Sequence, residues 1–496
     1  MTGLPSSCPD LRRPSPARPW VFLLAALVVA FGVYANTFAN GWTYDDTPVI
    51  LQNPDIQSFA GFLANQQPGR PLRELSLMFD RALFGMQPAG WHVQQIFWHG
   101  LNGFLVGALL LRLGGGLTAA VLAALVFLVH PLQVEVVAQL SHRKDSLALA
   151  FALLAMHAYV TAGGAAAWRR RAGWLLLSGT LFAAGCLAKE SVVVLPLVMI
   201  LYELLFVARE DRLLSRSPRL LLVLAGSGVL GGLAWYLGLG GRDRLLTLAG
   251  YQLMKYNYFD PVNEFSYLLI LLKSWLFIFL RTLWPADLAL EYVYPLPSSV
   301  ADLWVLGALA MLTAWAAALY FSWKRHPVYA FALGWVACLW LPVANLWPTS
   351  AYFAADRYLY APFAGVAILC GLGAAALARR RQLPALIGAG LLLVALCVLT
   401  WRQNAVWKDQ LSLWRQAARV SPQSSVALNN YGVQLFRLGQ RREGLALIER
   451  AAQNPYYYEA NANAAQIYQS MGLPDKADYF RRRAGDPHAG QKFRFW

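Results

Sequence analysis

WVFLLAALVVAFGVYANTF, residues 20–38, is an apolar run long enough to cross a bilayer as a helix. Three arginines precede it, Arg12, Arg13 and Arg18, and two adjacent acids, Asp45 and Asp46, follow closely. An apolar run behind a basic segment is typical either of a cleaved signal peptide or of a first membrane span. We favour an uncleaved span, because the acids behind it form the sharpest polar motif of the chain.

The composition extends this interpretation to most of the chain. Its 496 residues are 58% hydrophobic and only 14% charged, which excludes an ordinary soluble globular protein. Many apolar runs are separated by short polar connectors, so the predicted fold is all-α, a polytopic bundle of membrane helices. We predict eleven spans, near residues 20–38, 92–113, 116–132, 146–162, 172–188, 191–207, 220–240, 303–323, 328–347, 358–377 and 383–400.

The net charge of +16 indicates topology rather than nucleic-acid binding, because the basic residues lie in small clusters between apolar runs. If the N-terminus is cytoplasmic, the cytoplasmic connectors hold sixteen basic and four acidic residues, as the positive-inside rule requires. The chain is therefore predicted to be a multi-pass protein of the inner (cytoplasmic) membrane. An odd number of spans places the C-terminus on the periplasmic or extracytoplasmic side.

One apolar segment does not fit this count. Residues 265–284 are apolar enough to span but contain Lys273 and Arg281, and a crossing here would invert everything that follows. We predict a non-crossing segment, re-entrant or along the outer interface, where basic side chains extend to lipid phosphates.

The C-terminal part differs in kind, because the apolar runs stop near Trp401. Gly432 and Gly444 are followed 33 residues later by Ala465 and Ala477, a period typical of tetratricopeptide-type helical hairpins. The repeats would form a groove for an acceptor protein or peptide, or alternatively a cap or dimerisation unit. The predicted parts are a tail (1–19), a catalytic membrane core (20–240, with outer loop 39–91), an outer loop (241–302), further membrane helices (303–400) and the repeats (401–496).

The two acids behind the first span are the candidate catalytic residues. In this position Asp45 is suited to withdraw a proton from an acceptor hydroxyl while Asp46 orients or charges the site. Adjacent carboxylates repel, so one of them is expected to be protonated or paired. The alternative is a helix cap beside a solvated acid.

A second polar cluster, residues 130–145, follows the third span: HPLQVEVVAQLSHRKD. Charge at bilayer depth is costly, so such a cluster is expected to face a cavity or a ligand. Arg143 and Lys144 suit a phosphate group, and the other candidates are His130, Glu135, His142 and Asp145. The spacing of the histidines and Glu135 matches no standard metal motif, and the five cysteines show neither metal-ligand spacing nor a disulfide framework.

Further charges are predicted at the same outer surface. Lys189 and Glu190 lie in the turn between the fifth and sixth spans, and Arg357 lies at the start of the tenth. Several connectors would thus supply acids and cations to one pocket for an anionic lipid headgroup. In the first connector, residues 70–81 have the pattern of an interfacial amphipathic helix, with Leu72, Leu75, Met78 and Phe79 on its apolar face.

At these residues the chain resembles the transmembrane and tetratricopeptide-repeat O-mannosyltransferase family, within the GT-C-type glycosyltransferases that use polyprenyl-phosphate sugars. The resemblance covers nearly the whole chain. Its motifs are Tyr44-Asp45-Asp46, the 130–145 stretch, Lys189-Glu190, Leu283-Trp284-Pro285-Ala286-Asp287-Leu288, residues 356–362 (DRYLYAP) and the repeats.

The resemblance implies transfer of a sugar, such as mannose, with inversion to a hydroxyl, such as Ser or Thr of an exported protein. By analogy Asp45 would be the base, Asp46 its support, and Arg143 with Arg357 or Lys189 would neutralise the lipid phosphate. No cofactor is implied beyond the lipid-linked donor, and a divalent cation is left open. Two alternatives remain: a lipid or polysaccharide acceptor, and a non-enzymatic membrane scaffold whose repeats recruit envelope proteins.

Overall fold

The computed structural model describes residues 19–64, 70–210, 212, 264–297, 299–346, 352–454 and 457–485. Within these ranges the chain is helical or irregular and contains no strand, so the predicted all-α class is confirmed. The chain forms two compact units, one of residues 1–216, 313–342 and 357–408, the other of residues 217–312, 343–356 and 409–496. The predicted span 220–240 and the tail ahead of residue 19 lie outside the described residues.

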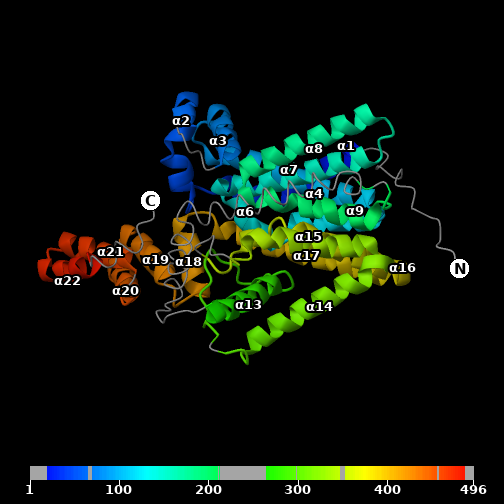
Figure 1. Ribbon diagram of the computed structural model, residues 1–496. Helices are drawn as coiled ribbons and strands as arrows, with labels where there is room; N and C mark the ends of the chain where they lie inside the picture. The colour runs from blue at the N-terminus through cyan, green and yellow to red at the C-terminus, as the bar shows by residue number, and fades with distance from the viewer. Residues whose placement is uncertain are drawn as a thin grey trace. The chain divides into compact units, whose positions relative to one another are not determined.

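The first unit is a helical bundle (Figure 1). Its helices are α1 (Pro19–Val33), α2 (Phe59–Ala64), α3 (Pro71–Phe84), α4 (Pro88–Arg112), α5 (Leu117–Val129), α6 (Val134–Ala138), α7 (Arg143–Gly163), α8 (Trp168–Ala188), α9 (Leu195–Phe206), α15 (Pro327–Trp340), α16 (Phe363–Arg380) and α17 (Gln382–Val406). Small residues let these helices approach closely, as is typical of membrane bundles. A Cβ on Gly371 of α16 would lie 2.3 Å from the carbonyl oxygen of Ala119 in α5, and one on Gly100 of α4 would lie 2.8 Å from Leu27 of α1.

The bundle is a multi-pass membrane assembly. Among the described residues, five helices are long and apolar enough to cross a bilayer: α7 extended back to Leu140, α8, α14 (Leu303–Arg325), α16 and α17. A sixth crossing is made if α5 and the helical segment Pro131–Ala138, bent by 53°, count as one span. Predicted span 92–113 corresponds to α4. This helix is less apolar than those five, because it contains four buried polar residues: His92, Gln95, His99 and Asn102. The total of eleven remains a prediction.

The end of α17 is bound to the connector that follows α1. The Asn404 side chain donates to the carbonyl oxygen of Val33 (3.1 Å), and the backbone N–H of Gly41 donates to the carbonyl oxygen of Lys408 (2.9 Å). The chain therefore leaves this unit, at residue 408, on the same face as the connector that carries Asp45 and Asp46.

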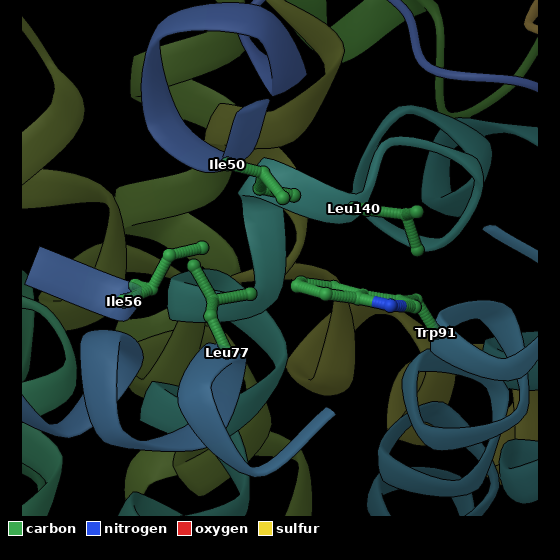
Figure 2. Packing of buried hydrophobic residues seen from close by; sticks show 5 residues of the cluster. All are labelled: Ile50, Ile56, Leu77, Trp91 and Leu140. Atoms are coloured by element: carbon green, nitrogen blue, oxygen red, sulfur yellow. The ribbon is translucent and has the colours of Figure 1, made fainter. Parts of the chain in front are cut away.

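That connector has its own small apolar core, shown in Figure 2, which gathers side chains from five segments: Ile50, Ile56, Leu77, Trp91 and Leu140. The predicted helix near 70–81 is present as α3. Glu74 and Asp80 of this helix face inward together with Leu77. The exposed apolar side chains are Leu75, Phe79 and Leu83, which form one stripe at helical spacing.

The second unit contains α13 (Glu264–Leu280) and the C-terminal helices α18 (Gln410–Val420), α19 (Ser425–Arg437), α20 (Arg441–Ala451), α21 (Tyr458–Ser470) and α22 (Pro474–Ala484). Lys273 of α13 does not extend to the surface as the sequence suggested. It is buried, and its Nζ lies 3.6 Å from Asp302 Oδ2. Whether α13 crosses the bilayer stays a prediction.

The C-terminal helices form two hairpins with the predicted period. A Cβ on Gly432 of α19 would lie 2.6 Å from the carbonyl oxygen of Gly444 in α20, so only glycine permits this crossing. The hairpin turns contain Gly439 and Gly472, both in the left-handed region (φ 86° and 72°) and 33 residues apart. These hairpins have the form that a tetratricopeptide-type array requires, while membership of that repeat class remains a prediction.

Candidate active site

Asp46 joins the first connector to the start of α7. Its Oδ1 accepts a hydrogen bond from the backbone N–H of Ser141 (2.8 Å), and its Oδ2 accepts one from the N–H of Thr43 (3.0 Å). Tyr44, which precedes the two acids, has a φ of 44°, a left-handed conformation that costs a non-glycine residue free energy and is enriched at functional sites. The double Asp is thus held in a specific turn and placed beside residues 140–145.

The two adjacent acids have different environments. Asp46 is fully buried, and this burial, aided by the charge of Asp45, raises the pKa of Asp46 to about 7 despite the two backbone donors. Asp45 is partly exposed, and among the described residues no hydrogen bond or ion pair engages its carboxylate. Near neutral pH, Asp46 therefore carries a proton part of the time, while Asp45 is partly open to solvent.

Arg143 is fully buried within a dense polar network. Its Nη2 donates to Asp80 Oδ2 (2.7 Å) and to the carbonyl oxygen of Trp91 (3.1 Å), and its other nitrogens contact Gln94, Gln95 and Ser76. As placed, this guanidinium fixes α3 and α4 to α7 and offers no open face to a phosphate. Burial, opposed by Arg143, raises the pKa of Asp80 to about 6.

The partners of Arg143 were not identified from the sequence. The available signal was the 3.6-residue spacing of Glu74, Leu77 and Asp80, which places both acids on one face of α3. Acids on such a helix usually face solvent. Arg143, which is buried at the start of α7, pairs with Asp80 and so favours an inward position for this acid.

Around Lys144 the structure gathers three other cations from two connectors. Lys189 Nζ lies 2.5 Å from Asp145 Oδ1, and Arg70 Nη2 lies 2.8 Å from Glu190 Oε1. Arg73 pairs with Glu74. The charges of Arg70, Arg73 and Lys189 repel the Lys144 ammonium group, whereas the charge of Asp145 attracts it. Within the described part of the chain, no hydrogen bond or ion pair engages the half-buried Lys144 ammonium group.

The remaining candidates lie around α6. Arg357 Nη1 pairs with the Glu135 carboxylate, which also accepts the backbone N–H of Arg357 (2.8 Å). His142 Nδ1 is 3.3 Å from the carbonyl oxygen of Glu135, and His130 Nδ1 accepts the N–H of Leu132 (3.3 Å). The Glu135 carboxylate thus binds Arg357, whereas the two histidines contact backbone groups. No group of three or more potential metal ligands occurs among the residues that the structure describes.

The first unit thus contains every predicted site residue. One junction connects Asp46 with Ser141 at the start of α7. A second consists of the ion pairs Lys189–Asp145 and Arg70–Glu190. Arg70 is a further residue that the sequence analysis had not singled out. The Glu135–Arg357 pair connects the segment before α16 to α6.

Fold and site together define a polytopic membrane protein with two adjacent acids and several cations near the start of α7. Comparison with known proteins adds similarities in sequence. Residues 80–235 match the family described as dolichyl-phosphate-mannose-protein mannosyltransferase. The resemblance to the transmembrane and tetratricopeptide-repeat O-mannosyltransferases is confirmed by individual relatives, which are named protein O-mannosyl-transferases.

Among these relatives, protein O-mannosyl-transferase TMTC4 of Mus musculus is 26% identical over 86% of this chain and 66% of its own length. Protein O-mannosyl-transferase Tmtc3 of Drosophila melanogaster is 25% identical over 88% of this chain and 55% of its own length. The chain thus spans less than two thirds of these relatives. The crystal structure of ArnT from Cupriavidus metallidurans bound to undecaprenyl phosphate is similar with a TM-score of 0.40 and 15% identity, covering 96% of this chain and 79% of that chain.

Proposed function

We propose that this protein is an integral membrane glycosyltransferase that transfers mannose, with inversion, from a polyprenyl-phosphate carrier to a Ser or Thr hydroxyl of exported proteins. The observation that carries the proposal is the hydrogen bond between Asp46 and Ser141, because it brings the accessible Asp45 to the helix end that bears Lys144. The names of the relatives support the reaction class and the sugar.

In the proposed reaction Asp45 is the general base. Its carboxylate takes the proton of the acceptor hydroxyl as that oxygen attacks the anomeric carbon. The bond from this carbon to the carrier phosphate breaks on the opposite face, so the configuration inverts and the polyprenyl phosphate leaves with the electron pair. Asp46 supports the base, since its two backbone hydrogen bonds fix the turn that presents Asp45.

The leaving phosphate gains negative charge, and preorganised cations stabilise that charge most effectively. Lys144 is the best placed, because no residue of the described chain pairs with its ammonium group. Arg70 and Lys189 strengthen the positive potential around it, although each also pairs with a carboxylate. Arg143 acts as a positioning residue, since its donors are committed to α3 and α4.

The proposed topology follows the charge bias of the sequence. The N-terminus is cytoplasmic, and the mouth with Asp45 opens on the periplasmic or extracytoplasmic side. Residue 408, the last of the first unit, shares the face of Gly41. The hairpins that follow it in the sequence are proposed to bind the acceptor protein. The lipid-linked donor brings the activated sugar, so no further cofactor is part of the proposal.

The test is a transfer assay with the full chain in lipid nanodiscs, polyprenyl-phosphate mannose and Ser/Thr-containing peptides. We expect mannosyl peptides from the wild type and none above background from Asp45→Asn. Asp55→Asn, a carboxylate removed from the same connector, is the matched control and should retain activity. Full activity in a correctly folded Asp45→Asn variant would discard the assignment of the base. Absence of mannosyl peptide, with transfer instead to added glycolipid, would discard the protein acceptor.

A further inference from the structure

The first unit contains a cavity whose walls are basic. It has a volume of about 720 Å³ and lies among the C-terminal ends of α4, α7 and α9 and the start of α8. Arg112, Arg170 and Arg171 line it together with aromatic side chains that include Trp174 and Phe206. The volume falls in the range of small-ligand sites.

The cavity lies far from the candidate active site along the same helix. Ser141 to Asp145 mark the beginning of α7, whereas Tyr159 to Gly163 at its end line the cavity. A helix of this length rises about 30 Å, which is the thickness of the bilayer hydrocarbon core. Because α7 is one of the helices able to cross a membrane, the cavity lies at the opposite bilayer surface from Asp45.

Among the described residues that line the cavity, a single carboxylate faces its three arginines. Arg112 donates to the His157 carbonyl oxygen and to Thr161 Oγ1 (2.7 Å each), and Arg171 Nε donates to the Ala162 carbonyl oxygen (3.3 Å). These contacts cap the end of α7 with neutral acceptors. Within the described lining, the one carboxylate is Glu203, which already accepts a hydrogen bond from Tyr159 (2.7 Å).

Arg170, unlike Arg112 and Arg171, takes no part in capping the end of α7. Its side chain lines the cavity and is exposed, and no described residue forms a hydrogen bond or ion pair with it. Arginines that share one cavity repel unless an anion lies between them. A phosphate is the anion that suits these arginines best, because one guanidinium group can donate two parallel hydrogen bonds to phosphate oxygens.

We propose that this cavity binds the phosphate headgroup of an anionic phospholipid from the leaflet opposite the active site. Basic pockets between membrane helices are a recognised type of lipid headgroup site. Exposed Trp168 and Trp174 stand at the start of α8, where indole rings favour the membrane interface. The lipid's phosphate lies between Arg170 and Arg171, and its chains leave along the bundle.

The experiment measures lipid retained by the full-length protein. Protein delipidated in detergent is titrated with phosphatidylglycerol or with phosphatidylcholine, and bound lipid is counted by native mass spectrometry. The wild type should prefer phosphatidylglycerol. Arg170→Gln and Arg171→Gln should each bind it about fivefold more weakly, since a basic residue at a membrane surface contributes about a factor of five. Arg170→Lys should retain most of the binding.

Arg169→Gln is the matched control, because it removes the same charge from an exposed neighbour outside the cavity lining. The proposal is overturned if Arg169→Gln weakens binding as much as Arg170→Gln, or if phosphatidylcholine binds equally well. A third arm adds inorganic phosphate. Displacement of the lipid by millimolar phosphate would assign the cavity to a soluble anion instead. These readouts involve no sugar transfer, so they stand apart from the test of the active site.

Discussion

The carboxylate of Asp46 accepts the backbone N–H of Ser141 at 2.8 Å, across 95 residues of sequence. The hydrogen bond connects the turn behind the first helix to the start of α7. It fixes two segments that must act together if Asp45 is to serve as the base and Lys144 as a phosphate ligand. Because Asp46 is buried while its neighbour is partly exposed, we propose separate functions for the adjacent acids, one structural and one chemical.

Burial of Asp46 predicts a pH dependence of stability. Its pKa of about 7 in the folded protein exceeds the ordinary value of about 4 for an unfolded chain. Between these values the folded state binds more protons than the unfolded state, so the contribution of Asp46 to stability falls as pH rises from about 4 to about 7. Thermal unfolding in nanodiscs should show this slope in the wild type and a flatter one in Asp46→Asn.

Asp55→Asn provides the control for this measurement, since it removes a carboxylate from the same connector. Its unfolding temperature should follow that of the wild type across the pH range. If Asp46→Asn keeps the wild-type slope, the Asp46 carboxyl does not titrate in this window and its burial has been misread.

Lys144 is predicted to act on the donor. A charge-assisted hydrogen bond to phosphate is worth about 1.5–3 kcal/mol, so Lys144→Gln should lower kcat/KM for the polyprenyl-phosphate sugar by about tenfold to a hundredfold. Arg81→Gln, which removes a cation from the nearby helix α3, should leave transfer within about twofold. Steady-state kinetics with varied donor would measure both. Equal losses in the two variants would indicate a general effect of charge rather than a phosphate ligand.

The sequence predicted the helical class and the cluster of charges for identifiable reasons. Apolar runs and the positions of basic residues report directly on bilayer crossing. The double Asp was recognisable because it follows the first apolar run at once. The inward orientation of Asp80 was not predictable in this way, since it depends on Arg143, 63 residues further along the chain.

The same contrast holds for the cations. Lys189 was identified from its position at a turn between two apolar runs, and the structure places it beside Asp145. Arg70 was overlooked because it lies in a long polar connector, where a single arginine carries no periodic signal. Its pairing with Glu190 is a tertiary contact across 120 residues, which no local pattern encodes.

The hairpin crossing gives a prediction for the C-terminal helices. A Cβ on Gly444 would lie 2.5 Å from the carbonyl oxygen of Gly432 and 2.7 Å from the Phe436 nitrogen, and both are backbone atoms that cannot yield easily. Gly444→Ala should therefore separate α19 from α20 and speed proteolysis of the C-terminal helices. The Arg442→Ala variant changes a residue on the exposed side of α20, and a protease should cleave it at the wild-type rate. Equal cleavage would show that the helices are not packed at Gly444.

The pair of Arg143 and Asp80 is best tested by a double-mutant cycle. Both side chains are fully buried, so removing one partner leaves an uncompensated buried charge and typically costs about 3–5 kcal/mol. Arg143→Met and Asp80→Leu should each lower the unfolding temperature sharply, and the double variant should lose less than the sum of the two. Because α3 stays attached in the double variant, it should also recover part of the transfer activity. If Arg143 contacted the lipid phosphate itself, the double variant would regain stability but no activity, and this outcome would move Arg143 from a positioning role to the catalytic centre.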